Sequence, residues 1–263
     1  MKLVLLDLDK TLIDESYNLT DSHITTVVQQ LERDGIQVGL CSDSPLATLQ
    51  FWCKKIAATG PIVFERGAGI FHRGEKSFPN RHNTLWFPEL RANFVNCCLE
   101  LLPEIGLFIG DAVQVVRNKT KLPHSRSVLI NGLRECSFSF HVIADKKEQA
   151  NELLKSLGDN AEKIAQSLWK GKLDVEINKE YLISIIHADD TRKKLAVQSL
   201  MHRFGQVYFI GDSLNDYVDT PGVVQCAVAN ASANYKAKSA LIASKEYTKG
   251  VIEILEKIWR NKK

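Results

Sequence analysis

The sequence predicts an α/β protein: a doubly wound, Rossmann-like core with a parallel sheet, into which an α+β domain is inserted. Three observations predict this class. Short apolar runs that suit buried strands alternate with helical periodicity over residues 3–72, the same alternation returns from residue 191 onward, and the stretch between them has a different pattern. We therefore assign the core domain to residues 1–76 and 188–263 and the inserted domain to residues 77–187.

Length and composition fit a globular protein of one large or two modest domains, since the chain has 263 residues. Its 34 basic and 31 acidic residues leave a net charge of +3, which is too balanced to indicate a nucleic-acid partner. The six cysteines lack metal-ligand spacing. Without a signal peptide or an apolar run long enough to cross a bilayer, we expect a cytoplasmic protein with no membrane partner.

The first strand sets the frame for the core. Residues 3–6 are four consecutive apolar residues, which is typical of a strand buried on both faces. The strand ends at Asp7 and Asp9, and the carboxyl ends of parallel strands are where open α/β sheets bind ligands. Taken alone, this pair also fits a turn with two solvated aspartates.

The next elements continue the alternation of helix and strand. Helical spacing over residues 24–31 ends at Gly35, and a second buried strand over residues 36–41 stops at the polar turn that begins with Ser42. A helix over residues 46–56 and short strands at 61–64 and 69–72 follow. Each of these connections suits a parallel sheet covered by helices.

The inserted domain mixes helices and strands in another order. We expect helices near residues 90–101 and after residue 145, and strands at 107–116, 127–130 and 138–144, with one more pair inside 173–187. Residues 138–142 alternate strictly, which is typical of a sheet with one covered face. The core then resumes with a helix over 191–204, strands over 206–210 and 223–228, and a short and a final helix.

A second acidic turn follows the strand over residues 206–210. It carries Asp212 and Asp216, and if this strand lies beside the first one, four carboxylates share one crevice. Carboxylates so close repel one another, and a divalent cation offsets this most simply. Hard oxygen ligands favour Mg²⁺. Taken alone, Asp212 and Asp216 also fit a helix cap.

Two further polar residues suit an anion. Ser42 ends a strand just before a helix, where a hydroxyl and backbone N–H groups can hold a phosphate, although the turn is also a good helix start without a ligand. Lys193 lies in the first turn of its helix, where a cation opposes the helix dipole, and this indicates a specific task. A basic patch with Arg192 and Lys194 is the alternative.

These pieces resemble, in chain order, the four motifs of the haloacid dehalogenase-like hydrolases: residues 7–11, Ser42, Lys193 and residues 211–216. A domain inserted between the second and third motifs is similar to the cap of the sugar-phosphatase (Cof-like) branch, and residues 61–70 and 227–231 resemble that branch as well. Residues 129–135 resemble the cap of the archaeal phosphoglycolate phosphatases. Asp43 departs from the glycine usual in the family, and the loop at 120–127 looks longer, so the substrate stays open.

The resemblance implies a Mg²⁺-dependent phosphatase that hydrolyses a small phosphomonoester, phosphoglycolate or a sugar phosphate, through a phospho-aspartyl intermediate. Asp7 is then the nucleophile, Asp9 the general acid and base, and Ser42 with Lys193 the pair that holds the phosphoryl oxygens. The implied metal ligands are Asp7, Asp9, Asp212 and Asp216, and the implied substrate contacts are Ser42, Asp43, Lys193, Asn215 and Arg134. Arg134 is expected to bind a carboxylate through two parallel hydrogen bonds, with an exposed arginine beside Glu135 as the alternative.

The same residues are compatible with two other functions and disfavour a third. A phosphosugar mutase shares the chemistry and returns the phosphoryl group to a sugar, and a non-catalytic phosphometabolite-binding protein could use the same fold. A phosphorelay receiver domain is disfavoured because it is shorter, and because its lysine follows the last acidic strand whereas Lys193 precedes Asp212. A monomer and a homodimer are both compatible with the sequence.

Overall fold

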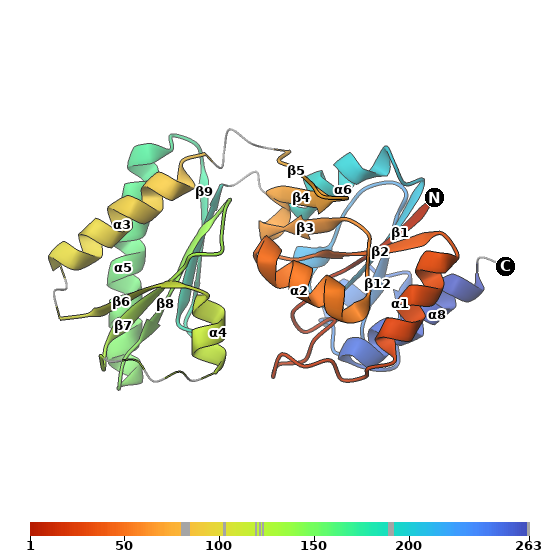
Figure 1. Cartoon of the computed structure of the whole chain (residues 1–263), viewed down its shortest axis with the longest axis horizontal. Helices are drawn as coiled ribbons and strands as arrows, with labels where there is room; N and C mark the ends of the chain where they lie inside the picture. Colours follow the sequence, from red (N-terminus) through yellow and green to blue (C-terminus); the bar gives the residue numbers. More distant parts are fainter. Residues whose placement is uncertain are drawn as a thin grey trace. The chain divides into compact units, whose positions relative to one another are not determined.

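The computed structural model describes residues 1–79, 85–101, 104–118, 120, 122, 124–188 and 192–261. The chain divides into two compact units, which Figure 1 shows coloured along the sequence. Unit 1 comprises Met1–Pro79 and Arg192–Lys263, and unit 2 comprises Asn80–Thr191. These boundaries lie a few residues beyond the predicted 76/77 and 187/188, and the last strand of unit 2 runs to Ala188.

Unit 1 is built on an eight-stranded sheet with β1 near its middle. β1 is hydrogen-bonded in parallel to β11 on one side and to β2 on the other, and among the described strands of this sheet only β4 runs in the opposite direction, antiparallel to both β3 and β5. In spatial order the strands are β13 (Leu241–Ile242), β12 (Val223–Ala227), β11 (Gln206–Gly211), β1 (Lys2–Leu6), β2 (Ile36–Cys41), β3 (Ile62–Phe64), β4 (Gly69–His72) and β5 (Glu75–Ser77).

Both faces of this sheet are covered. Leu3, Val4, Leu5 and Leu6 are all fully buried, although successive side chains of a strand point to opposite faces. Leu3 and Leu5 share a core with α6, while α1 packs against α2 and α8. The helices are α1 (Ile24–Arg33), α2 (Leu46–Ile56), α6 (Lys193–Met201), α7 (Ala233–Lys236) and α8 (Tyr247–Arg260). The predicted α/β class is confirmed.

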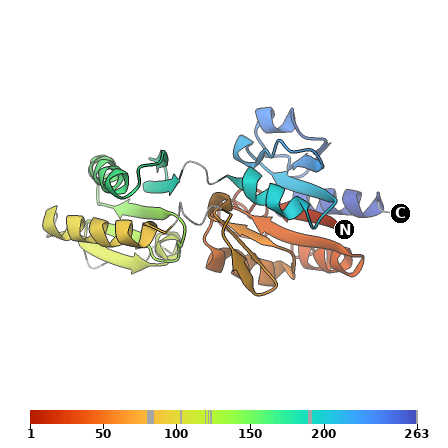
Figure 2. The ribbon, with the colours of Figure 1, turned by 90° about the horizontal axis from the view of Figure 1, so that it is seen from above.

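Unit 2 is a five-stranded sheet with two long helices, α3 (Phe87–Leu101) and α5 (Lys147–Leu168), packed against each other and on one face of the sheet (Figures 1 and 2). Phe94 of α3 stacks on Phe140 at 4.7 Å between ring centroids and meets Phe138 edge-on at 5.0 Å. In spatial order the strands are β6 (Gly106–Gly110), β7 (Ser127–Asn131), β8 (Phe138–Ile143), β10 (Ile183–Ala188) and β9 (Leu173–Asn178).

Three sequence-based expectations about these elements need correction. The strand expected at 107–116 is β6 followed by a short helix, α4 (Ala112–Arg117), because the Asp111 carboxylate accepts a hydrogen bond from the Gln114 N–H at 3.0 Å and caps the helix. The valines of α4 had favoured a strand. β8 has two buried faces, since Ser139 and His141 are buried as well as the phenylalanines.

The third correction concerns α6. This helix was expected over 191–204 and ends at Met201, and residue 191 lies outside the described part of the chain. No helix among the described residues is both long and apolar enough to cross a membrane.

Candidate active site

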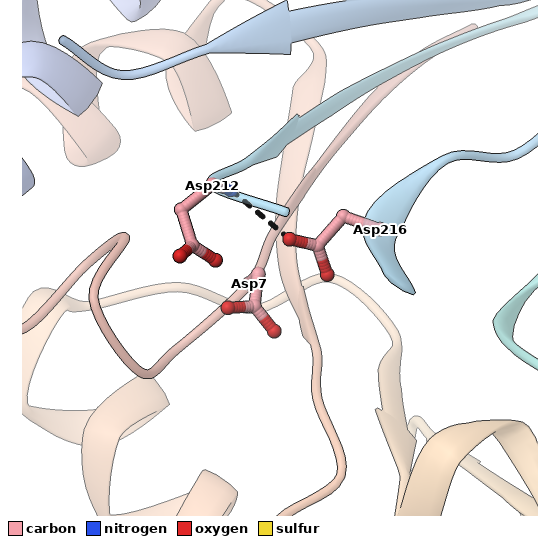
Figure 3. Close-up of side chains that lie close together, drawn as sticks. All are labelled: Asp7, Asp212 and Asp216. Carbon is pink, nitrogen blue, oxygen red and sulfur yellow. Dashed lines mark hydrogen bonds between the residues drawn. The ribbon is translucent and has the colours of Figure 1, made fainter. Parts of the chain in front are cut away.

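Three carboxylates converge at the carboxyl ends of two neighbouring strands (Figure 3). Asp7 follows β1, and Asp212 and Asp216 belong to the turn after β11, which contains the short helix η3 (Leu214–Asp216). One oxygen from each of the three lies within 4.8 Å of the others. The Asp7 N–H donates to the Ile210 carbonyl at 2.9 Å, so the parallel pairing of the two strands continues into the site.

Asp216 uses both of its carboxylate oxygens inside the protein. Oδ2 accepts hydrogen bonds from the backbone N–H groups of Asp212 at 3.0 Å and Ser213 at 3.1 Å, and Oδ1 accepts one from Lys193. Gly211 leaves space for this carboxylate, because a Cβ at that position would lie 2.5 Å from Asp216 Oδ2. Asp216 therefore fixes the acidic turn and the lysine together.

Lys193 joins the two acidic turns. It is the first residue of α6, it is buried, and its Nζ donates to Asp7 Oδ1 at 2.7 Å and to Asp216 Oδ1 at 2.5 Å. Burial opposes the positive charge, but the carboxylates of Asp216 and Asp7 outweigh it and raise the pKa of Lys193. The lysine is therefore protonated at neutral pH and offsets part of the negative charge around it.

One lysine does not offset three carboxylates. Burial and the nearby Asp216 raise the pKa of Asp7 well above its ordinary value, although Lys193 acts in the opposite direction. Burial and Asp216 likewise raise the pKa of Asp212 to about 7. Asp7 and Asp212 can both be ionised at neutral pH only if further positive charge is present, and a divalent cation with oxygen ligands supplies it. The residues present thus fit a bound Mg²⁺.

Ser42 lies at the end of β2 and is buried. Its N–H donates to the Val63 carbonyl at 3.0 Å, and its Oγ accepts from the Ser44 N–H at 3.2 Å. The hydroxyl is thus held in one orientation at the start of the turn. Asp43 beside it is half-buried.

The remaining predicted residues are less enclosed or belong to the other unit. Asp9 and Asn215 are exposed. Arg134 lies in unit 2, where its Nη1 donates to Ser137 Oγ at 2.8 Å. This arginine is buried, which excludes the exposed arginine considered as its alternative.

Asn230 is a site-supporting residue that the sequence analysis did not single out. Its Nδ2 donates to the Lys10 carbonyl at 2.6 Å, and its Oδ1 accepts from the Tyr247 N–H at 3.1 Å. Lys10 has a left-handed backbone with φ of 59°, and Asn230 holds the turn that contains it. The two residues are 220 positions apart, so no local pattern could have paired them; the only signal was the family resemblance of residues 227–231.

A family model described as haloacid dehalogenase-like hydrolase matches residues 4–255 of the chain. The chain belongs to this family. The resemblance inferred from the four motifs is confirmed, and so is the expectation of a hydrolase.

Individual relatives of this haloacid dehalogenase-like hydrolase are distant but match it along its length. The chain is 22% identical to a phosphoglycolate phosphatase of Staphylothermus marinus, with 98% of each chain covered. Its fold is similar to a haloacid dehalogenase-like hydrolase from Bacteroides thetaiotaomicron, with a TM-score of 0.69, 19% identity and coverage of 98% and 99%. A trehalose-6-phosphate phosphatase related protein has a TM-score of 0.61, 13% identity and coverage of 99% and 100%.

Proposed function

We propose that this hydrolase is a Mg²⁺-dependent phosphatase that hydrolyses a small phosphomonoester through a phospho-aspartyl intermediate on Asp7. The observation that carries the proposal is the shared lysine: Nζ of Lys193 bonds Asp7 at 2.7 Å and Asp216 at 2.5 Å, beside Asp212. The relatives named phosphoglycolate phosphatase and trehalose-6-phosphate phosphatase related protein support a phosphate ester as substrate.

Asp7 is the proposed nucleophile. Its Oδ1 is bonded to Lys193, which leaves the other oxygen for attack on phosphorus. A bond forms between that oxygen and phosphorus as the bond from phosphorus to the leaving oxygen breaks, and Asp9 gives the leaving oxygen a proton. Asp9 then removes a proton from the water that attacks the phospho-aspartyl group, and inorganic phosphate leaves. The exposure of Asp9 suits this exchange of protons with water.

The proposed Mg²⁺ ligands are the carboxylates of Asp7 and Asp212 and the backbone carbonyl of Asp9, with Asp216 in support. Both oxygens of Asp216 are already bonded, one to Lys193 and one to the turn at Asp212, so Asp216 orients the other groups. When bound, Mg²⁺ supplies the positive charge that lets an anionic carboxylate approach an anionic phosphate. Burial and the nearby Asp216 raise the pKa of Asp212 to about 7, and a bound cation would act against both effects.

Ser42 and Lys193 are the proposed contacts of the phosphoryl oxygens, where negative charge accumulates in the transition state. Asp43 and Asn215 remain predicted substrate contacts, and Arg134 a predicted contact for a substrate that carries a carboxylate. Phosphoglycolate and sugar phosphates are the candidate substrates. The cytoplasmic location and the choice between monomer and homodimer also remain predictions.

The test is release of inorganic phosphate from p-nitrophenyl phosphate, 2-phosphoglycolate and sugar phosphates in the presence of Mg²⁺. We expect release that EDTA stops and Mg²⁺ restores. Asp7→Asn should abolish turnover because an amide is not a nucleophile, while Asp219→Asn at an exposed position should keep it. Phosphate retained on a sugar product would instead indicate a mutase, and folded protein that is silent on every ester would indicate a binding protein.

A further inference from the structure

The short 3₁₀ turn η1 (Glu65–Gly67) lies between β3 and β4 and adopts an unusual backbone. Glu65 and Arg66 both have left-handed conformations, with φ of 48° and 62°, and Gly67 follows with φ of 96°. Side chains rarely accept this conformation, and two such residues in succession persist only where surrounding contacts hold them. Those contacts reach two parts of the active site.

On one side the turn holds the segment of Ser42. The Arg66 N–H donates to the Ser42 carbonyl at 3.2 Å, and the Glu65 N–H donates to the Ser44 carbonyl at 3.1 Å. Because the Ser42 N–H is itself bonded to the Val63 carbonyl, the backbone of Ser42 is fixed on both sides. The two residues with left-handed backbones, Glu65 and Arg66, are thus the ones whose N–H groups hold the Ser42–Ser44 segment.

On the other side the turn packs against the start of α6. A Cβ on Gly67 would lie 2.4 Å from the Arg192 carbonyl oxygen and 3.0 Å from the Lys193 backbone nitrogen. Both are backbone atoms, so neither can swing away. Only a glycine permits this approach, and the residue so approached is Lys193, whose Nζ bonds Asp7 and Asp216.

We propose that the Glu65–Gly67 turn is a positioning element that sets the separation between Ser42 and Lys193, and that Gly67 is the positioning residue. This turn donates a hydrogen bond to the Ser42 carbonyl and packs against the backbone of Lys193. The inference rests on the proposed function, in which these two residues hold oxygens of the same phosphoryl group. Such a pair works only when its separation matches the phosphoryl oxygens, and displacements of about 1 Å cost on the order of 100-fold in rate.

Gly74 provides a matched control for Gly67. It also has a left-handed conformation, with φ of 85°, but a Cβ there would meet nothing within 4 Å. It lies in the turn between β4 and β5, in the same unit. Gly67→Ala and Gly74→Ala therefore share the cost of placing alanine in a left-handed conformation, and only Gly67→Ala displaces the start of α6.

The experiment measures the kinetics of p-nitrophenyl phosphate hydrolysis with Mg²⁺, together with inhibition by inorganic phosphate, for the whole protein and both variants. For Gly67→Ala we expect kcat to fall and Ki for phosphate to rise, each by about 10- to 100-fold. Gly74→Ala should leave both within about twofold of wild type, because its added methyl group displaces no backbone. Irreversible loss of folded protein lowers kcat in proportion to the folded fraction, measured by circular dichroism, and leaves Ki unchanged, whereas reversible partial unfolding raises Ki and KM together by only the reciprocal of that fraction. A folded Gly67→Ala variant with the wild-type Ki would overturn the inference.

Hydrogen exchange on the unaltered protein gives a second test, which holds even if Gly67→Ala does not fold. Saturating inorganic phosphate and Mg²⁺ should slow exchange of the Glu65 and Arg66 amides and leave the amides of the turn between β4 and β5 unchanged. Unchanged exchange at Arg66 would overturn the inference. If the wild-type protein hydrolyses no ester, both the proposed function and this inference are overturned. If the wild type is active and the Gly67→Ala variant behaves like it, only the inference is overturned.

Discussion

Replacing Lys193 by methionine removes the one side chain that the structure shows bonded to both Asp7 and Asp216. Methionine fills a similar apolar volume, so the change is chiefly the loss of a charge. The two carboxylates then stay close together without the cation that held them. We therefore expect Lys193→Met to lose both activity and stability.

The size of the stability loss follows from burial. The side chains of Lys193 and Asp7 are each 8% exposed and that of Asp216 is 2% exposed, so both ion pairs are of the buried kind. Removing one partner of a buried pair costs about 3–5 kcal/mol, whereas an exposed pair is worth about 0–1 kcal/mol. We therefore expect Lys193→Met to lower the free energy of unfolding of the metal-free protein by about 3–5 kcal/mol.

The loss should depend on pH in a defined direction. Without Lys193, which lowers it, the already raised pKa of Asp7 in the folded protein rises further above its value in the unfolded chain. An acid with a raised folded-state pKa takes up a proton on folding and destabilises the folded state more as pH rises. The difference between wild type and variant should therefore be largest above neutral pH and shrink toward acidic pH.

Urea unfolding in EDTA, followed by circular dichroism at several pH values, measures this loss. Lys194→Met, an exposed neighbour on the same helix, is the control and should change stability by about 0.5 kcal/mol or less. Mg²⁺ at 100 times its Kd adds about 2.7 kcal/mol to any form that binds it only when folded, wild type included, so the comparison is made in EDTA. A Lys193→Met variant as stable as Lys194→Met in EDTA at pH 8 would refute the reasoning.

Two further predictions concern stability away from the active site. Burial favours the neutral form of Glu253, but hydrogen bonds from Lys257 and Ser244 outweigh it and lower the pKa of Glu253 to about 2. The resulting stabilisation is present above the usual pKa of 4.5 and is lost as pH falls toward 2. In urea unfolding, Glu253→Gln should therefore lower stability at pH 6 and have little effect at pH 2. An equal loss at both pH values would contradict this. In unit 2, Phe94→Ala should lower the free energy of unfolding by about 3–5 kcal/mol because it leaves a cavity at a fully buried position. Leu99→Ala, on the exposed side of the same helix, should lower it by about 0.5 kcal/mol or less. Similar losses for the two variants would show the core assignment to be wrong.

The parts of the fold that could be predicted are those with a local signal. β1 was predicted because four consecutive apolar residues precede an acidic turn, and the structure confirms that this strand is buried on both faces. α4 was missed because its valines favour a strand, and the capping bond from Asp111 to Gln114 that starts the helix is a matter of three-dimensional geometry. Residue type alone does not reveal whether the strand preference of the valines or the helix cap at Asp111 decides the structure.

The candidate site divides in the same way. Asp7, Asp212 and Asp216 could be expected near one another because parallel strands end at one edge of a sheet. The sharing of Lys193 between two acids could not, since its partners lie 186 and 23 positions away. The same holds for Gly67, whose requirement for glycine comes from the backbone of Arg192 and Lys193. Contacts of this kind depend on the finished packing of the sheet and its helices.

The place of β1 in the sheet has a consequence for synthesis on the ribosome. β1 pairs with β2, which follows soon after it, and with β11, whose residues 206–211 are made only after the whole of unit 2. At a synthesis rate of about 5–20 residues per second, β11 is made roughly 10–40 s after β1, and one edge of β1 stays unpaired until then. During that interval an apolar central strand has an unpaired edge, and unit 2 can fold first. The nascent chain therefore depends most on protection from aggregation just before its last quarter emerges.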